Sequence, residues 1–348
     1  PIARAGFNAG EIDRGSFGYR NDWANVEFGR GREIVGPMAE DNLALSGDSP
    51  AFERLVLQAK HGKFSYRYFY GFLEAVDDTT GNILRYLVGR TLEFNNHRNL
   101  VIGLTELSVL AGRERPIDWA FLNPLALHVE IEQNDRDSKP SGNSENGLWI
   151  LSGDWKVSNR LRLAGSVLLD DFQLDAKDRE KTQDQLGYQL HCAWTPITQP
   201  GIITAWGDYV QIGTFTTQHN TSYTNFVNRG VYLGHPIGND ADLIKVGVRL
   251  ILRKPVAIEA GYGQRRGGDN SLLADPSKTR HGAPHESFPS GNVRTARFLD
   301  FKIDSQPWRN LAVGVEGEID LMHRGSDSGR ERVTITLCYA LPFVKNPR

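Results

Sequence analysis

The sequence predicts an all-β fold, an antiparallel transmembrane β-barrel of the outer-membrane type, with about 14–18 strands and long extracellular loops. Three observations predict it: polar and apolar residues alternate with a period of two, the alternating segments are long, and short and long connections follow each other along the chain. No apolar run approaches the roughly 18 residues of a membrane-spanning helix. A hydrophobic content of 39% and a mean hydropathy of −0.42 still fit a barrel, because half of each strand faces a polar interior.

The clearest strand pattern lies in residues 147–174. Trp149, Leu151 and Trp155 share one face of the first arm, and Ser158-Asn159 suits the tight turn of a β-hairpin. Each arm is about twice as long as the roughly 5–6 residues of an ordinary soluble strand. Long paired strands are typical of a membrane-spanning barrel and less so of a soluble β-sandwich, which is the alternative fold.

The segment 310–322 shows which face lines the interior. Leu311 and Val313 begin an apolar face, and Glu316 and Glu318 lie on the opposite one. Carboxylates two residues apart cannot face hydrocarbon, so we expect this face to line the lumen.

The same alternation predicts fourteen strands: 22–30, 52–60, 63–76, 84–95, 99–111, 147–157, 160–174, 186–195, 201–213, 243–253, 256–264, 293–304, 310–322 and 332–343. Residues 125–133 carry a weaker strand pattern, and the strand number stays even only if this segment does not cross the membrane. Residues 1–22 form a separate N-terminal segment, either a plug or a first strand. Residues 23–348 form a single transmembrane barrel.

The connections between these strands alternate in length. Those at 61–62, 96–98 and 158–159 are short, whereas those at 112–146 and 214–242 are long. This pattern is typical of outer-membrane barrels, in which the short turns are periplasmic and the long loops are extracellular.

The predicted lumen face carries charges of both signs, which suggests ion-pair networks that brace the barrel. The formal net charge of −2 gives no electrostatic support for a nucleic-acid partner. Cys192 and Cys338 fall on opposite faces of their strands, so we expect no disulfide between them. No metal-type spacing of Cys and His occurs, and we expect no cofactor.

Several separated stretches stand out together: EFGRGREIVGP followed by NLALSGDSPAFERL (27–55), RNLVIGLTELSVLAG (98–112), FLNPLAL (121–127), LLDDFQLD (168–175) and LGHPIGNDAD (233–242). In this order they resemble the Wzi family of capsule-assembly outer-membrane proteins. The resemblance covers most of the chain from about residue 23 onward.

The resemblance implies an eighteen-stranded barrel in the bacterial outer membrane, with a small helical bundle on its periplasmic side. It also implies a non-enzymatic surface lectin that holds capsular polysaccharide at the cell. The expected partners are surface polysaccharide, outer-membrane lipid and lipopolysaccharide, and a surface or envelope protein assembly. The strand count falls short of eighteen, and no helical bundle is evident in the sequence. A diffusion channel for small polar solutes or oligosaccharides is the alternative function.

A glycan site is expected on the long loops, because an aromatic ring can stack on a pyranose while amides and carboxylates bind its hydroxyl groups. The residues of this kind are Trp119, Asn123, Asp170, Tyr223, Asn225, His235, Asn239 and Asp240. The alternative is that these loop residues pack on one another.

No motif predicts a catalytic residue. Asp170 and Asp171 are adjacent in a strand and point to opposite faces, so they do not form an acid–base pair. Gly47-Asp48-Ser49 is similar to an esterase motif but is followed by Pro50. Asn239, Asp240 and Asp242 near His235 could bind calcium, although a polar turn is the favoured interpretation. We therefore expect neither catalytic nor metal-binding residues.

Overall fold

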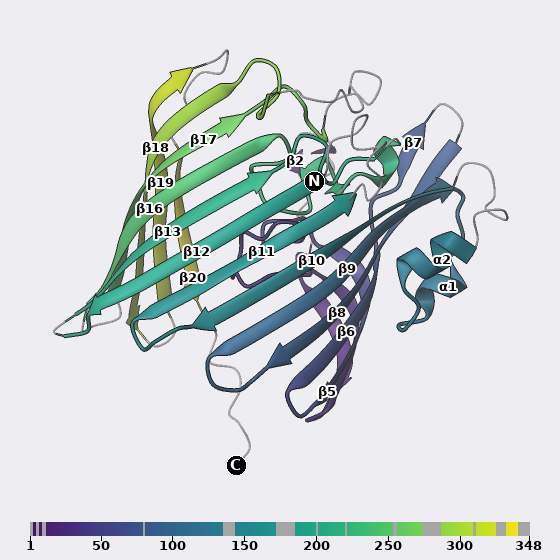
Figure 1. Ribbon diagram of the computed structural model, residues 1–348, viewed down its shortest axis with the longest axis horizontal. Helices are drawn as coiled ribbons and strands as arrows, with labels where there is room; N and C mark the ends of the chain where they lie inside the picture. The colour runs from purple at the N-terminus through teal and green to yellow at the C-terminus, as the bar shows by residue number, and fades with distance from the viewer. Residues whose placement is uncertain are drawn as a thin grey trace.

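The computed structural model describes residues 3–4, 7–8, 12–78, 81–134, 143–171, 185–199, 201–219, 221–252, 256–273, 287–308, 311–324 and 332–339. Its main element is a sixteen-stranded antiparallel sheet that curls into a barrel (Figure 1). Hydrogen-bonded neighbours follow the order of the chain, from β3 at one edge of the described sheet to β20 at the other. The fold is therefore that of an outer-membrane β-barrel, as the sequence predicts.

All fourteen predicted strands are present. The long strands are β4 (Ala24–Gly31), β5 (Phe52–His61), β6 (Phe64–Phe72), β8 (Gly81–Asn95), β9 (Leu100–Arg113), β10 (Ser144–Lys156), β11 (Leu161–Asp171), β12 (Gln185–Ile197), β13 (Ile202–Ile212), β16 (Ala241–Ile251), β17 (Val256–Gly267), β18 (Arg294–Trp308), β19 (Leu311–Arg324) and β20 (Arg332–Tyr339). Two further strands join this sheet, because β3 (Gly15–Arg20) pairs with β4 and the short β7 (Val76–Asp78) pairs with β8. Outside it, β1 (Ala3–Arg4) pairs with β2 (Phe7–Asn8).

Short and long connections alternate around the barrel, as predicted. The hairpins β5–β6, β8–β9 and β10–β11 turn within a few residues at one end. The loops 32–51 and 213–240 lie at the other end, which we call the long-loop end.

The two faces of the sheet differ as the alternation predicts. One face, the lumen face, carries Phe69, Leu107 and Phe298 from distant strands in a single apolar cluster. The opposite, outer face leaves apolar side chains such as Leu190 and Val246 exposed. An exposed apolar outer face is the surface that a membrane-spanning barrel presents to lipid.

Loop 32–51 folds back into the lumen. Leu43 and Leu45 belong to the lumenal apolar cluster, and a bridge between Val35 and Leu45 holds the loop as a narrow turn. Glu33, at the start of this loop, pairs with Arg54 at 2.5 Å and with Arg67 at 2.9 Å. The loop is thus fixed to β5 and β6 by a carboxylate between two guanidinium groups.

Ion pairs along the lumen face confirm the predicted networks. Arg265 contacts Glu318 at 2.8 Å and Asp320 at 3.4 Å, and Lys245 contacts Asp300 at 3.3 Å. Each pair joins residues of different strands, so the networks brace the wall across strands.

The predicted strand at 125–133 is wrong. The segment forms α2 (His128–Asn134), preceded by α1 (Trp119–Leu122) with Asp118 as its N-cap. A strand cannot be inserted here, because β9 and β10 already pair directly from Ala111–Ser144 to Leu100–Trp155. None of the described helices is long and apolar enough to cross a membrane.

The helices pack on the outer face near the long-loop end (Figure 1). Phe121 and Ile131 contact the aromatic side chains of Tyr68, Tyr70 and Tyr86, which point away from the lumen. We call residues 117–134 the helical hairpin.

Replacing Glu33 with alanine is expected to destabilise the barrel by about 2–3 kcal/mol, because the buried Arg54 would keep only Glu27, at 3.0 Å, as a carboxylate partner and Arg67 would lose its contact with Glu33. Glu33 and Arg54 are only 2% and 5% exposed at their side chains. The free energy of unfolding in urea, followed in detergent by loss of the heat-modifiable band, measures this change.

Glu53→Ala is the matched control. Glu53 also pairs with an arginine, Arg30, but its side chain is 53% exposed. We expect a loss under about 1 kcal/mol for this variant. Equal losses for the two variants would contradict a special role for Glu33.

Candidate functional site

The long-loop end is the candidate functional site, because two loops meet there inside the barrel wall. Loop 213–240 contains the 3-10 helix η1 (Ser222–Thr224) and the small hairpin of β14 (Val227–Asn228) and β15 (Val231–Tyr232). Phe226 and Leu233 of this loop join the lumenal apolar cluster. Loops 32–51 and 213–240, with the described parts of 268–293, form what we call the loop cluster.

Backbone contacts connect the two main loops. The amide of Ser46 donates to the carbonyl of Leu233 at 2.8 Å, and the amide of His235 donates to the carbonyl of Leu43 at 3.3 Å. Gly234 permits this approach, since a Cβ atom there would lie 2.0 Å from the Leu43 oxygen. Any larger residue at position 234 would force the loops apart.

Arg85 of β8 attaches the η1 segment to the wall. Its guanidinium donates to the carbonyls of Tyr223 at 2.6 Å, Asn225 at 2.9 Å and Val227 at 2.8 Å. Charge-assisted bonds to three successive parts of one loop fix its position strongly.

Asp240 joins two loops. Its carboxylate is fully buried and accepts from Thr214 Oγ1 at 2.8 Å, from the Asn270 amide at 3.1 Å, and from Ser290 through its amide and hydroxyl at 2.8 and 2.6 Å. The residue has a φ of 54°, a conformation that aspartate tolerates better than most residues. Because its oxygens already accept these four bonds, Asp240 holds the β13–β16 and β17–β18 loops together.

Two asparagine amides extend this connection. Asn239 Nδ2 donates to the Thr214 carbonyl at 2.6 Å, and Asn239 Oδ1 accepts from the Leu272 amide at 3.1 Å. Asn225 Oδ1 accepts from the His219 amide at 3.1 Å, and its Nδ2 donates to the Leu272 carbonyl. Both side chains therefore hydrogen-bond to backbone amides and carbonyls of the loop cluster, which regular strand pairing does not reach there.

His235 is buried in the same cluster and accepts from the Ile237 amide through Nδ1 at 3.3 Å. Burial, with a contribution from Lys245, lowers the pKa of His235 from 6.5 to about 4. The imidazole is therefore neutral at physiological pH. Asp41 behaves in the opposite way, since burial and the neighbouring Asp48 raise its pKa to about 6.

The structure thus brings four of the predicted glycan residues together, but within the protein. Asn225, His235, Asn239 and Asp240 are buried and bind other parts of the loops. Tyr223 lies in the same loop and is half-buried.

Asp170 lies on the lumen face at the end of β11. Its Oδ2 accepts from the Thr217 amide at 2.6 Å, so it fixes the start of loop 213–240. The side chain of Asp171 lies outside the described residues. Asp242, considered above for calcium, pairs with Arg266 of β17.

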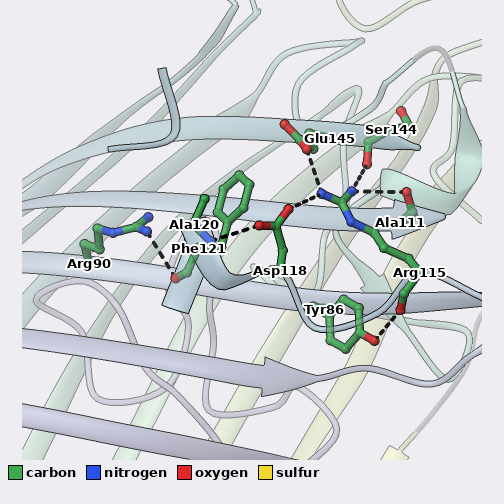
Figure 2. A network of polar contacts seen from close by, with 9 residues as sticks. All are labelled: Tyr86, Arg90, Ala111, Arg115, Asp118, Ala120, Phe121, Ser144 and Glu145. Carbon is green, nitrogen blue, oxygen red and sulfur yellow. Dashed lines mark hydrogen bonds and ion pairs between the residues drawn. The ribbon is translucent and has the colours of Figure 1, made fainter. Parts of the chain in front are cut away.

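Trp119 and Asn123 lie elsewhere, on the helical hairpin of the outer face. Figure 2 shows the network at the base of this hairpin, where Arg115 contacts Glu145 at 2.7 Å and Asp118 at 3.1 Å. Tyr86 donates to the Arg115 carbonyl at 2.7 Å in the same network. The two residues are thus separated by the barrel wall from the lumenal loops.

Sequence reasoning missed Arg85, whereas Tyr232 is one of the long-loop aromatic residues that the sequence offers for sugar stacking. Tyr232 is half-buried in the loop cluster, with its hydroxyl 3.1 Å from Ser271 Oγ and its ring against Gly238. Alternation along β8 places Arg85 on the lumen face. A charged side chain on that face could have indicated a contact with a lumenal loop.

Cavities flank the loop cluster inside the barrel. One of 340 Å³ is lined by Glu33, Arg67, Glu93 and Asp154 among others. Another of 690 Å³ is lined by charges of both signs, including Arg249 and Lys302. Mixed charge favours neutral, hydroxyl-rich molecules or water over a single class of ion.

The esterase-like segment Gly47-Asp48-Ser49 lies beside these cavities. The Ser49 side chain is buried, and its carbonyl accepts from Arg32 Nε at 2.7 Å. Among the described residues, no group of three or more His, Cys, Asp or Glu side chains is arranged to hold a metal ion. Cys192 is exposed on the outer face of β12, and the side chain of Cys338 lies outside the described residues.

No family model matches the sequence, and no curated protein matches it. The structure is similar to that of Wzi from Escherichia coli, an outer-membrane protein involved in group 1 capsule assembly and described as a carbohydrate-binding β-barrel. The TM-score is 0.64 at 11% identity, and the match covers 94% of this chain and 77% of that one. BamA from Haemophilus ducreyi lacking POTRA domains 1–3 matches with a TM-score of 0.44 at 9% identity, over 90% of this chain and 64% of that one, which is too low to support an inference. The likeness to Wzi concerns the fold, which is that of an outer-membrane β-barrel.

Proposed function

We propose that this protein is a non-enzymatic outer-membrane β-barrel, distantly related to the Wzi family, that binds polysaccharide at the bacterial cell surface through its loop cluster. The observation that carries the proposal is the loop cluster itself, which fills the long-loop end of a barrel whose fold matches a carbohydrate-binding protein. Because loops occupy the lumen, the outward surface of the cluster is the part that meets a surface ligand.

The order of the loop cluster supports this function. Arg85 and Asp240 fix it at separate points, so a ligand would meet a surface that needs little ordering on binding. Tyr223 and Tyr232 are the half-buried aromatic side chains of loop 213–240, and a partly buried ring can stack on a sugar while staying fixed. The four buried predicted residues then support the site without contacting the glycan.

Tyr223→Ala and Tyr232→Ala are each expected to lower the affinity for the host's own exopolysaccharide about tenfold, or about 1.4 kcal/mol. The physical reason is the loss of one stacking ring from the binding surface. Biolayer interferometry of the detergent-solubilised protein measures this affinity.

Tyr262→Ala is the control, because Tyr262 is an exposed tyrosine on the outer face of β17. Its affinity should equal that of the wild type. If the wild type itself does not bind the exopolysaccharide, the proposal that this protein binds polysaccharide is wrong. Point variants are preferable to replacement of loop 213–240, which would remove Phe226 and Leu233 from the lumenal cluster.

Acidification is expected to loosen the loop cluster. The folded-state pKa of His235 is about 4, below its usual 6.5, so its contribution to stability is present above pH 6.5 and is lost as the pH falls toward 4. Asp41 acts in the opposite direction over the same range, because its folded-state pKa is raised to about 6. Comparing wild type with His235→Gln separates the two effects.

Limited proteolysis of the loops at pH 7 and pH 4.5 measures this opening. We expect cleavage of the wild type to increase at the lower pH and cleavage of His235→Gln to change less. An identical increase in both proteins would show that His235 does not control the opening.

A diffusion channel is the alternative function, and conductance in planar bilayers tests it. We expect no steady conductance from the wild type, because loops 32–51 and 213–240 occupy the lumen. A variant with residues 35–46 replaced by a short Gly-Ser linker should conduct more than the wild type, since Leu43 and Leu45 would be gone while Phe226 and Leu233 stay. Steady conductance of the wild type would favour the channel.

A further inference from the structure

The helical hairpin covers an ion pair on the outer face of the barrel. Arg90 of β8 and Glu106 of β9 pair at 3.1 Å, with side chains 3% and 1% exposed. Their neighbours along each strand, such as Val88 and Leu110, pack under the same hairpin. The pair therefore lies on the side of the wall that faces away from the lumen.

Neighbouring strands place this ion pair at the depth of the lipid-facing belt. In the register of the sheet, Arg90 pairs with Glu106 and lies near the middle of β8, which has 15 residues. A membrane-crossing strand needs about 9–11 residues, so the middle of this strand lies at membrane depth. The row continues through Tyr68 and Leu57 to Val26 on one side, and through Trp149 to Leu169 on the other. Val26 and Leu169 are apolar and exposed, at 43% and 38%. The hairpin is thus bracketed by lipid-facing positions.

The inner side of the hairpin supplies hydrogen bonds to the charged pair of the wall. The amide of His128 donates to Glu106 at 3.0 Å, and Arg90 donates to the carbonyls of Phe121 and Asn123 at 3.4 Å. Tyr68 donates to the Phe121 carbonyl at 2.8 Å. The His128 ring fits closely against the sheet because residue 147 is glycine, where a Cβ atom would lie 2.3 Å from the ring.

Several polar groups at the tip of the hairpin are paired within the protein, and the exposed polar side chain there is that of Asn123. Asn123 Oδ1 accepts from the Leu125 amide at 3.1 Å, and the Asn123 carbonyl accepts from the Ala126 amide at 3.3 Å. Residue 124 is a proline without an amide hydrogen, and its carbonyl accepts from Tyr66. Backbone groups paired in this way are a requirement for a segment that contacts hydrocarbon.

Most of the side chains known to be exposed on the outer side of the hairpin are apolar. Trp119 is 83% exposed and Leu125 76%, and Ile117, Leu127 and Val129 are exposed as well. Glu130 is also exposed, in the helix that leads from the tip back toward β10 at the long-loop end. Where a protein passes from the headgroups into the acyl chains, tryptophan is expected at the headgroup level and leucine deeper in the bilayer.

We propose that the helical hairpin is embedded in the outer half of the bilayer, with lipid acyl chains contacting Leu125 and Leu127 and with Trp119 nearer the headgroups. Trp119 then acts as a membrane anchor and not as a sugar-stacking ring. The inference depends on the barrel lying in a membrane and does not depend on polysaccharide binding.

Site-directed fluorescence tests this placement. In a variant whose native cysteines are replaced (Cys192→Ser and Cys338→Ser), single cysteines at positions 119 and 125 are labelled with an environment-sensitive dye. The labelled barrel is folded into phosphatidylcholine vesicles with a nitroxide midway along the acyl chains, or with iodide in the buffer. Val26→Cys is the lipid-facing control, and Val231→Cys on the β14–β15 hairpin is the aqueous control.

We expect position 125 to be quenched by the lipid nitroxide and shielded from iodide, as at position 26, with weaker nitroxide quenching at position 119. Iodide access without nitroxide quenching at position 125, as at position 231, would overturn the proposal. Shielding from both quenchers would also overturn it, because a protein surface would then cover the hairpin. Absence of nitroxide quenching at position 26 would overturn both this inference and the membrane location, whereas a lack of polysaccharide binding would affect neither.

Discussion

The buried charged side chains discussed above, on both faces of this barrel, are met by an opposite charge or by several hydrogen-bond partners. Glu33 lies between Arg54 and Arg67 in the lumen, and Asp240 receives four hydrogen bonds in the loop cluster. On the outer face, the Arg90–Glu106 pair is covered by a helical hairpin whose backbone supplies further hydrogen bonds. Since an unpaired buried charge costs several kcal/mol, these groups determine where the loops can lie, and apolar packing fills the space between them.

The strands could be predicted from the sequence because their signal is local. Alternation of polar and apolar residues in segments such as 310–322 indicates which face of the strand each residue lies on. The same pattern predicted all fourteen of the expected strands. The helices at 119–134 could not be predicted in the same way, since each is too short for a clear helical period. Their position depends on partners far away in the sequence, such as Tyr68 for Phe121.

The candidate site was predicted only in part. Four of the polar residues predicted in loop 213–240 lie together, but composition cannot distinguish a polar residue that binds a ligand from one that binds another loop. Asp240 contacts Ser290, fifty positions later, and no local pattern encodes that contact. A local signal did exist for Arg90 and Glu106, because charged residues at lipid-facing positions of a strand require a cover.

The contacts of Asp240 also constrain the order in which the protein can assemble. Glu33, Arg54 and Arg67 are close in the sequence, so the loop 32–51 can be fixed as soon as β4 to β6 have paired. Asp240 instead needs Thr214, Asn270 and Ser290, which arrive with β13, β17 and β18. The long-loop end therefore stays incomplete until most of the wall has formed. A barrel inserted from its C-terminal strands would meet its lumenal loops in the reverse order, with the Asp240 contacts made before those of Glu33.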